Sequence, residues 1–167
     1  DHDHIRVVVR LRPYSRGEAV LQAEGADSEV ALRTEGATLL VRHGNETAQH
    51  KFDACLPEVT GQEDLLAQLE PWLVDPLMGG TNVTLLCCGG PGSGKQFSLF
   101  GSGSSPGLVQ LVSRALFQRL RAPTPPGVKR THTVRASHAL LDDDAAYDML
   151  AERGGVDSTD DKGLQLR

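Results

Sequence analysis

The chain has 167 residues, of which 39% are hydrophobic and 23% are charged, a composition typical of a soluble globular protein rather than a disordered one. The net charge of -5 argues against a broad nucleic-acid surface, because such binding needs many cations against phosphates. No run approaches the roughly 20 apolar residues of a membrane span, and the polar start differs from a signal peptide. We therefore expect a cytoplasmic protein that binds neither nucleic acid nor membranes. The absence of an initiator Met predicts an excerpt of a longer polypeptide.

Cysteine and histidine give no sign of a metal site or of a disulfide framework. Three cysteines are present, and the adjacent Cys87 and Cys88 lie in an apolar run, so we expect small core residues of a reducing compartment. The start Asp1-His2-Asp3-His4 imitates a metal site, but histidines at a chain terminus are more often inert. We assign no metal site and no catalytic residue.

The N-terminal third contains short stretches with strand character. Strands are predicted at residues 5–11, within 30–43 and at 51–56, because these stretches are rich in β-branched or alternating apolar residues. Pro13 should close the first strand. Glu35-Gly36 is a plausible hairpin turn inside the second stretch, which His43-Gly44-Asn45 should end.

Two helices are predicted from leucine spacing. A Thr60/Glu63 capping box should start the first, which continues with Leu65, Leu66, Leu69, Leu73 and Leu77. Pro71 and Pro76 should bend that helix or end it early, and Gly79-Gly80 closes it. The second helix is predicted over residues 108–120, with one apolar face.

The remaining segments complete an alternation of strands and helices. Residues 82–88 form a continuous apolar run, as expected for a central parallel strand covered on both faces. Residues 131–141 predict another strand, followed by Asp142-Asp143-Asp144 as a solvated turn or helix start, and residues 152–162 predict a loop. The order indicates an α/β layer architecture.

The segment that carries chemistry fits the phosphate-binding pattern G-x-x-x-x-G-K and follows the apolar run. It consists of Gly89, Gly90, Pro91, Gly92, Ser93, Gly94 and Lys95, followed by Gln96. Glycines allow the backbone to curl so that successive amides point at one anion. Lys95 would place a compact charge on the outer phosphates. The alternative, an ordinary Gly-rich turn, explains the strand before the loop and the placed lysine less well.

Gln96 departs from the pattern at the position that normally supplies a Ser or Thr hydroxyl to Mg²⁺. A neutral amide reproduces the short oxygen distances of magnesium poorly. Nucleotide binding is therefore expected to survive while Mg²⁺ binding and hydrolysis are weakened.

Residues 89–101 read G-G-P-G-S-G-K-Q-F-S-L-F-G and resemble the kinesin motor-domain signature G-Q-T-G-S-G-K-T-Y-T-M-x-G. Residues 5–13 are similar to the first kinesin strand, which ends in R-x-R-P. In that family the ending flanks the adenine, so the resemblance adds Arg10, Arg12 and Pro13 to the nucleotide site. From alternation alone, Arg10 and Arg12 fit a solvated strand face equally well.

The resemblance extends along the chain. Phe52-Asp53, Gln62-Glu63, Pro71, Gly79 and Asn82 fall at family positions before the phosphate loop. Residues 134–150 resemble V-S-F-L-E-I-Y-N-E-x-V-Y-D-L-L, and residues 162–167 would form the next strand. The resemblance implies an α/β P-loop NTPase fold of the kinesin type, with a central mixed sheet, helices on both faces, and residues 1–167 as the N-terminal part of the motor domain. The sheet would be incomplete in this chain.

The kinesin switch motifs N-x-x-S-S-R-S-H and D-x-A-G-S-E do not occur in the sequence. Because such segments position the attacking water and sense the γ-phosphate, ordinary turnover by this chain alone is not expected. The resemblance implies ATP and ADP as ligands, microtubules as the partner of the parent protein, ATP-driven movement, and a place on the cytoskeleton.

Two alternatives stay open at this point. A generic P-loop phosphotransferase or NTPase would use Asp142 as a magnesium-directing carboxylate after a hydrophobic strand. A divergent, non-catalytic kinesin relative would bind nucleotide weakly or act as a scaffold, which Gln96, Gly90-Pro91 and the lost Y-N-E favour.

Overall fold

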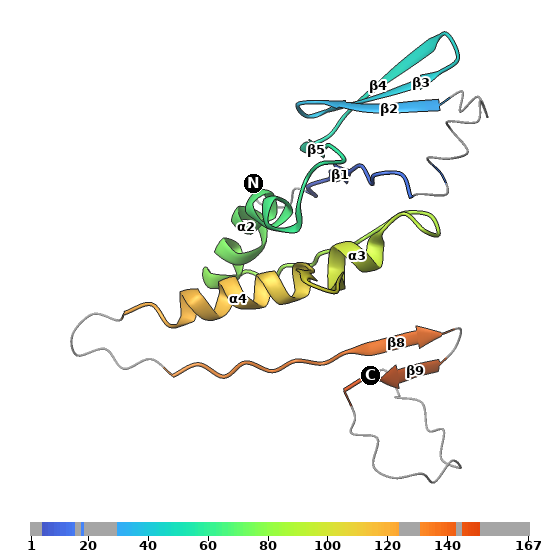
Figure 1. Ribbon diagram of the computed structural model, residues 1–167. Helices are drawn as coiled ribbons and strands as arrows, with labels where there is room; N and C mark the ends of the chain where they lie inside the picture. Colours follow the sequence, from blue (N-terminus) through green and yellow to red (C-terminus); the bar gives the residue numbers. More distant parts are fainter. Residues whose placement is uncertain (1–4, 16–17, 19–29, 124–130, 143–144, 151–167) are drawn as a thin grey trace. The chain divides into compact units, whose positions relative to one another are not determined.

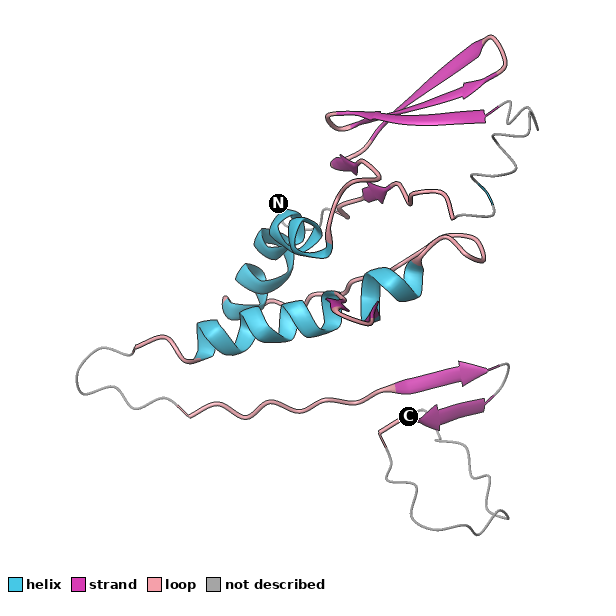
Figure 2. Cartoon of the chain, in the orientation of Figure 1, coloured by secondary structure: helices cyan, strands magenta, loops and turns pink. Residues whose placement is uncertain are grey.

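The computed structural model describes residues 5–15, 18, 30–123, 131–142 and 145–150. The chain divides into two compact units, residues 1–122 and 123–167. Figures 1 and 2 show the helices and strands of both units. The described strands form four separate sheets, one a parallel pair and three antiparallel. Strand directions are thus mixed, and the expected central sheet is incomplete.

A short parallel pair of strands contains Arg10, one of the predicted site residues. β1 (Val8–Arg10) pairs with β5 (Ala54–Leu56), with Val9 opposite Cys55. The pair is shorter than the predicted strands at 5–11 and 51–56. Cys55 is buried, and this burial raises the pKa of its thiol, as expected for a small core residue.

Strands β2 (Val30–Glu35), β3 (Thr38–His43) and β4 (Glu46–Lys51) form an antiparallel meander. The predicted hairpin is confirmed, because β2 and β3 join at Gly36, whose φ of 58° suits glycine. The prediction missed β4, whose side chains are all exposed. Its polar sequence carries no apolar alternation, so backbone pairing with β3 alone defines the strand.

The first predicted helix is α2 (Gln62–Met78), which ends at Gly79 as expected. The Thr60/Glu63 capping box is wrong by one residue, since the Gly61 N–H donates to Asp64 Oδ2 at 3.2 Å. Pro71 and Pro76 lie inside the helix and do not end it. Burial of Leu65, Leu69 and Val74 offsets the hydrogen bonds that the prolines remove.

Residues 82–88 join no strand ladder among the described residues. The prediction of a central, covered strand is therefore not met there: Leu86 is 80% exposed, and Leu85 is 40% exposed. Cys88 is exposed and Cys87 is half-buried, which corrects the expectation that both are core residues. Burial is the main cause that raises the pKa of Cys87, and the neighbouring Cys88 adds to it.

The phosphate-loop segment leads into α3 (Lys95–Phe100), a two-residue ladder of β6 (Gly101–Ser102) with β7 (Ser105–Pro106), and α4 (Leu108–Leu120). The α4 prediction is confirmed at both ends. Leu108, Leu65 and Leu69 form a buried cluster between α2 and α4. Arg119 on α4 also pairs with Glu70 at 3.2 Å and Asp75 at 3.0 Å on α2. These contacts fix the two helices together.

In the second unit, β8 (Ala139–Asp142) pairs antiparallel with β9 (Ala145–Asp148). The strand predicted at 131–141 is therefore paired only in its last part. The tail predictions for residues 152–162 and 162–167, and those for residues 1–4, fall outside the described residues. None of the described helices is both long and apolar enough to cross a membrane.

Candidate functional site

The Gly-rich segment forms a curled loop that ends at α3. Gly92 has φ 72° and Gly94 has φ 91°, both in the region that favours glycine. The Ser93 N–H donates to the Gly90 oxygen at 3.3 Å, and the Ser98 N–H donates to the Gly94 oxygen at 2.9 Å. The first bond closes the turn and the second starts the helix, so loop and helix form one continuous unit.

Gly89 meets the strictest backbone requirement in the loop. Its φ is 152°, and a Cβ there would collide with Ser93 Oγ. Residues other than glycine rarely adopt this backbone conformation. The loop therefore curls so tightly that Ser93 occupies the space a side chain at Gly89 would need. Such a cradle suits a group bound through backbone amides.

Lys95, the first residue of α3, bends back over this loop. Its Nζ donates to the Gly89 oxygen at 2.7 Å and to the Gly90 oxygen at 2.8 Å. Both are charge-assisted hydrogen bonds. They hold the predicted phosphate-binding cation against the loop, where an anion would have to compete with the two carbonyl groups.

Arg12 lies against Gly94 of the loop. A Cβ on Gly94 would come within 3.5 Å of Arg12 Cδ. The Arg12 guanidinium binds Glu18 through two bonds, Nη2–Oε1 at 2.6 Å and Nη1–Oε2 at 2.9 Å. This pairing, with help from Ser15, lowers the pKa of Glu18 to about 2, and the same hydrogen bond raises the pKa of Arg12. Pro13 is exposed beside it, and its oxygen accepts from Arg12 Nη1 at 3.2 Å.

Arg10 is directed toward the helices rather than into solvent. Its guanidinium donates to Gln62 Oε1 at 2.7 Å, Ser98 Oγ at 3.0 Å and the Thr60 oxygen at 3.0 Å. It also lies 5.6 Å from the centre of the Phe97 ring. Partial burial lowers the pKa of Arg10. The adenine-side role of Arg10, Arg12 and Pro13 stays a prediction.

Gln62, Ser98 and Glu18 also belong to this site, although their place in it was not predicted from the sequence. Gln62 had a signal, because Gln62-Glu63 matched a family position, but nothing in the pattern assigned it a contact. Glu18 lies three residues after Ser15, and the Ser15 N–H donates to Glu18 Oε2 at 2.6 Å. The Ser-x-x-Glu spacing is the available signal for that interaction.

Gln96 has an exposed side chain in the first turn of α3. The helix thus presents an amide where the pattern would present a hydroxyl. Among the residues that the structure describes, no group of three or more His, Cys, Asp or Glu side chains is arranged to hold a metal ion.

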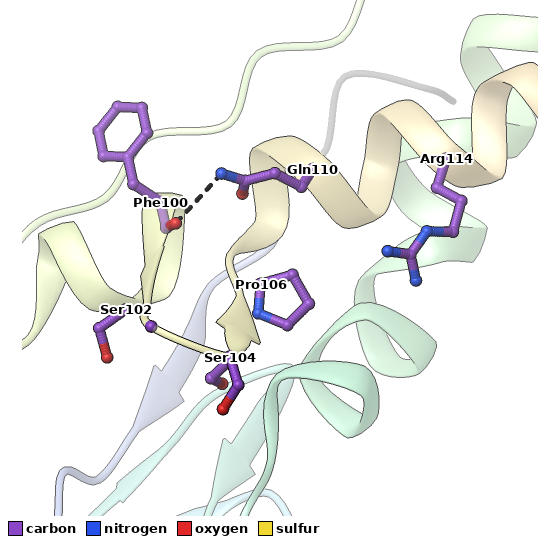
Figure 3. A pocket seen from close by; sticks show the side chains of 8 residues that line it. Phe100, Ser102, Ser104, Pro106, Gln110 and Arg114 are labelled. Carbon is purple, nitrogen blue, oxygen red and sulfur yellow. Dashed lines mark hydrogen bonds between the residues drawn. The ribbon is translucent and has the colours of Figure 1, made fainter.

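A separate pocket of about 340 Å³ lies at the C-terminal end of α3. Figure 3 shows it between the β6–β7 turn and α4, with Gln110 Nε2 donating to the Phe100 oxygen. It is lined by Phe100, Ser102, Gly103, Ser104, Ser105, Pro106, Gln110 and Arg114. None of these residues belongs to the phosphate loop, so the pocket and the loop are distinct features.

Comparisons with known proteins match most of the chain. The family model described as the kinesin motor domain matches residues 10–167. The chain is 28% identical over 167 residues to Kinesin-like protein 8 of Schizosaccharomyces pombe, covering 88% of this chain and 32% of that protein. It is also 28% identical over 157 residues to Kinesin-like protein KIN-8A of Oryza sativa subsp. japonica, covering 88% and 20%.

A solved structure of KIF14, segment 391-755, with ADP in complex with a microtubule, has a similar fold. The TM-score is 0.61 at 18% identity, and the match covers 87% of this chain and 48% of that one. The predicted α/β P-loop fold of the kinesin type is confirmed. The chain spans about a third or less of the length of the two curated relatives and about half of the solved segment.

Proposed function

The chain belongs to the kinesin motor-domain family, and from that premise we propose that it binds the phosphates of ATP or ADP through residues 89–96. The observation that carries this proposal is the loop itself. Gly89 and Gly94 hold backbone conformations that residues with a side chain rarely adopt, and Lys95 is already bent over the loop. A group of phosphate oxygens fits such a cradle, because backbone amides and one ammonium are its usual ligands.

Each residue has a defined part in this binding. The backbone amides of the loop would hold the phosphate chain, and Lys95 would exchange the Gly89 and Gly90 oxygens for phosphate oxygens. Arg10, Arg12 and Pro13 would lie on the adenine side, as the family resemblance implies. In the parent protein the nucleotide supplies the free energy that drives movement.

For the parent protein we propose microtubules as the partner and the cytoskeleton as the location. The family membership supports this proposal, and so does the fold shared with the KIF14 segment, which was solved with ADP in complex with a microtubule. Co-sedimentation of the parent protein with microtubules, at rising salt concentration, tests it. The partner assignment requires a pelleted fraction that rises with microtubule concentration, and a flat background would exclude it.

A second candidate, a nucleotide-binding relative with little or no hydrolysis, is favoured by Gln96. Its amide stands where a hydroxyl would bind Mg²⁺. In this case the chain binds nucleotide, but Mg²⁺ adds little to the affinity. Asp142, the residue that a generic phosphotransferase would use, ends β8 in the other unit. The family match favours the kinesin assignment over that third alternative.

Titration with a fluorescent ATP analogue, with and without Mg²⁺, tests both candidates on the chain and on Gln96→Thr. We expect saturable binding by the natural chain, with Mg²⁺ dependence gained in Gln96→Thr because threonine restores the hydroxyl ligand. Strong Mg²⁺ dependence of the natural chain would reject the weakened metal site. Absence of binding by both versions, in samples that show a cooperative melt by circular dichroism, would reject nucleotide binding.

A further inference from the structure

Among the residues that the structure describes, Gln62 is the one polar residue that is buried, with 6% of its surface exposed. It is the first residue of α2, and it contacts two elements that are distant in sequence. Its Oε1 accepts from Arg10 Nη1 on β1 at 2.7 Å, and its Nε2 donates to the Phe97 oxygen in α3 at 2.6 Å. We infer that Gln62 is a positioning residue that fixes the phosphate-loop helix α3 to β1 and α2.

The chemistry of the two partners explains why an amide stands at this position. A guanidinium has only donors, and a backbone carbonyl has only acceptor lone pairs. A side chain between them must accept from one and donate to the other, which a glutamine amide does. Ionised glutamate lacks the donor, lysine lacks the acceptor, and leucine lacks both. The partners therefore also fix which end of the Gln62 amide faces which element.

Arg10 extends the same network to α3 by two further contacts. It donates to Ser98 Oγ at 3.0 Å and places its guanidinium over the Phe97 ring. A cation over an aromatic face is an attractive contact. Together with the Gln62 bond, three interactions therefore meet at Phe97 and Ser98, within the first turn after Lys95.

The anchors of this network belong to the packed part of the unit. Val8 of β1 packs against the cluster of Leu65, Leu69 and Leu108, of which the first two lie on α2. The Thr60 oxygen, just before α2, accepts a third hydrogen bond from Arg10. The helix α3 has six residues and no buried side chain of its own. The network thus holds this helix against the packed part of the unit.

Gln62→Glu tests this inference, with amide hydrogen exchange and nucleotide titration as the two measurements. The carboxylate keeps an acceptor for Arg10 and removes the donor to the Phe97 oxygen, so the variant keeps the hydrogen bond that joins β1 to α2, now as an ion pair. Gln118→Glu is the matched control, because Gln118 is an exposed residue on α4. Gln62→Leu, which removes both bonds, is the stronger companion variant.

We expect the amides of residues 98–101 to exchange about tenfold faster in Gln62→Glu than in the natural chain. Exchange in β2–β4 should stay unchanged, and Gln118→Glu should match the natural chain throughout. Unchanged exchange at residues 98–101 in both Gln62 variants would overturn the inference. Faster exchange across all elements alike would also overturn it, because that result would indicate a general stability role.

The positioning role rests on the proposed phosphate site for its functional half, and the two measurements separate the failures. We expect Gln62→Glu to bind the fluorescent ATP analogue about tenfold more weakly than the natural chain. Equal affinity, despite faster α3 exchange, would overturn the link between this network and the loop. If the natural chain itself binds no nucleotide, the proposed function fails, whereas the exchange result still decides whether Gln62 positions α3.

Discussion

The Lys95 ammonium lies 2.7 Å from the carbonyl oxygen of Gly89, six residues earlier in the chain. The cation that should meet a phosphate is thereby held by the loop that should cradle it. Because a phosphate group carries more negative charge than two carbonyl oxygens, exchange of partners favours the bound nucleotide. The contact keeps the long lysine side chain over the loop, so less rotamer freedom is lost on binding.

Gly89→Ala should weaken nucleotide binding and strain the loop. The φ of 152° costs alanine about 1–3 kcal/mol, and the added methyl group meets Ser93 Oγ. The measurement is the affinity for the fluorescent ATP analogue together with the free energy of unfolding in urea.

Gly90→Ala is the matched control, because a Cβ there has open space and the position needs no positive φ. Its free energy of unfolding should stay within about 0.5 kcal/mol of that of the natural chain. The double variant Gly89→Ala/Ser93→Ala should recover part of the lost stability, since it removes the collision with Ser93 Oγ but keeps the close approach to Ser93 Cβ at 3.1 Å and the backbone strain. Equal effects of Gly89→Ala and Gly90→Ala would contradict the geometry of the loop.

The carboxyl of Glu18 should titrate with a pKa of about 2, below its ordinary value of 4.5. Because the folded value is lower than the unfolded one, the stabilisation by this carboxylate is present above pH 4.5 and is lost as the pH falls toward 2. Carbon NMR of the side-chain carboxyl measures it directly. Arg12→Gln should raise the pKa of Glu18 toward 4.5, because Arg12 is the main cause of the shift.

Lys51→Gln is the control for that titration, since Lys51 is an exposed cation on β4 outside the contacts of Glu18. The Glu18 pKa should be unchanged in this variant. If Arg12→Gln leaves the pKa of Glu18 where it was, the bidentate pair is not its cause.

Leu111→Ala should destabilise the chain by about 2–5 kcal/mol, the usual cost of truncating a buried leucine. Leu111 is 1% exposed on the core-facing side of α4. Leu86→Ala should change the free energy of unfolding by less than about 0.5 kcal/mol, because Leu86 is 80% exposed. Urea unfolding compares the two variants. A cost at Leu86 as large as that at Leu111 would mean that the apolar run is covered, as a central strand would be.

The two long helices and the curled Gly-rich loop could be predicted because their signals are local. Leu108, Leu111 and Ala115 repeat at helical spacing, so both ends of α4 agree with the pattern. The motif places its glycine and lysine at Gly94 and Lys95, and α3 begins at Lys95 with Gly94 as its N-cap. The hairpin at Gly36 depends only on a turn residue between two apolar stretches.

Other features depend on partners that a local pattern does not contain. β4 exists because β3 lies beside it, although its residues are polar and exposed. The apolar residues 82–88 resemble a covered strand, yet no described strand pairs with them. The contact between Gln62 and the Phe97 oxygen joins residues 35 positions apart. Residue spacing predicts local elements, and it does not predict contacts between residues that are distant in sequence.

The affinity of Lys95→Ala for the fluorescent ATP analogue shows directly whether residues 89–95 bind nucleotide phosphates. Lys51→Ala serves as the matched control, because it removes an exposed lysine from β4. We predict binding roughly ten- to a hundredfold weaker in Lys95→Ala, the value of one charge-assisted contact, and unchanged binding in Lys51→Ala. Equal affinities of Lys95→Ala and the natural chain would contradict phosphate binding by this loop.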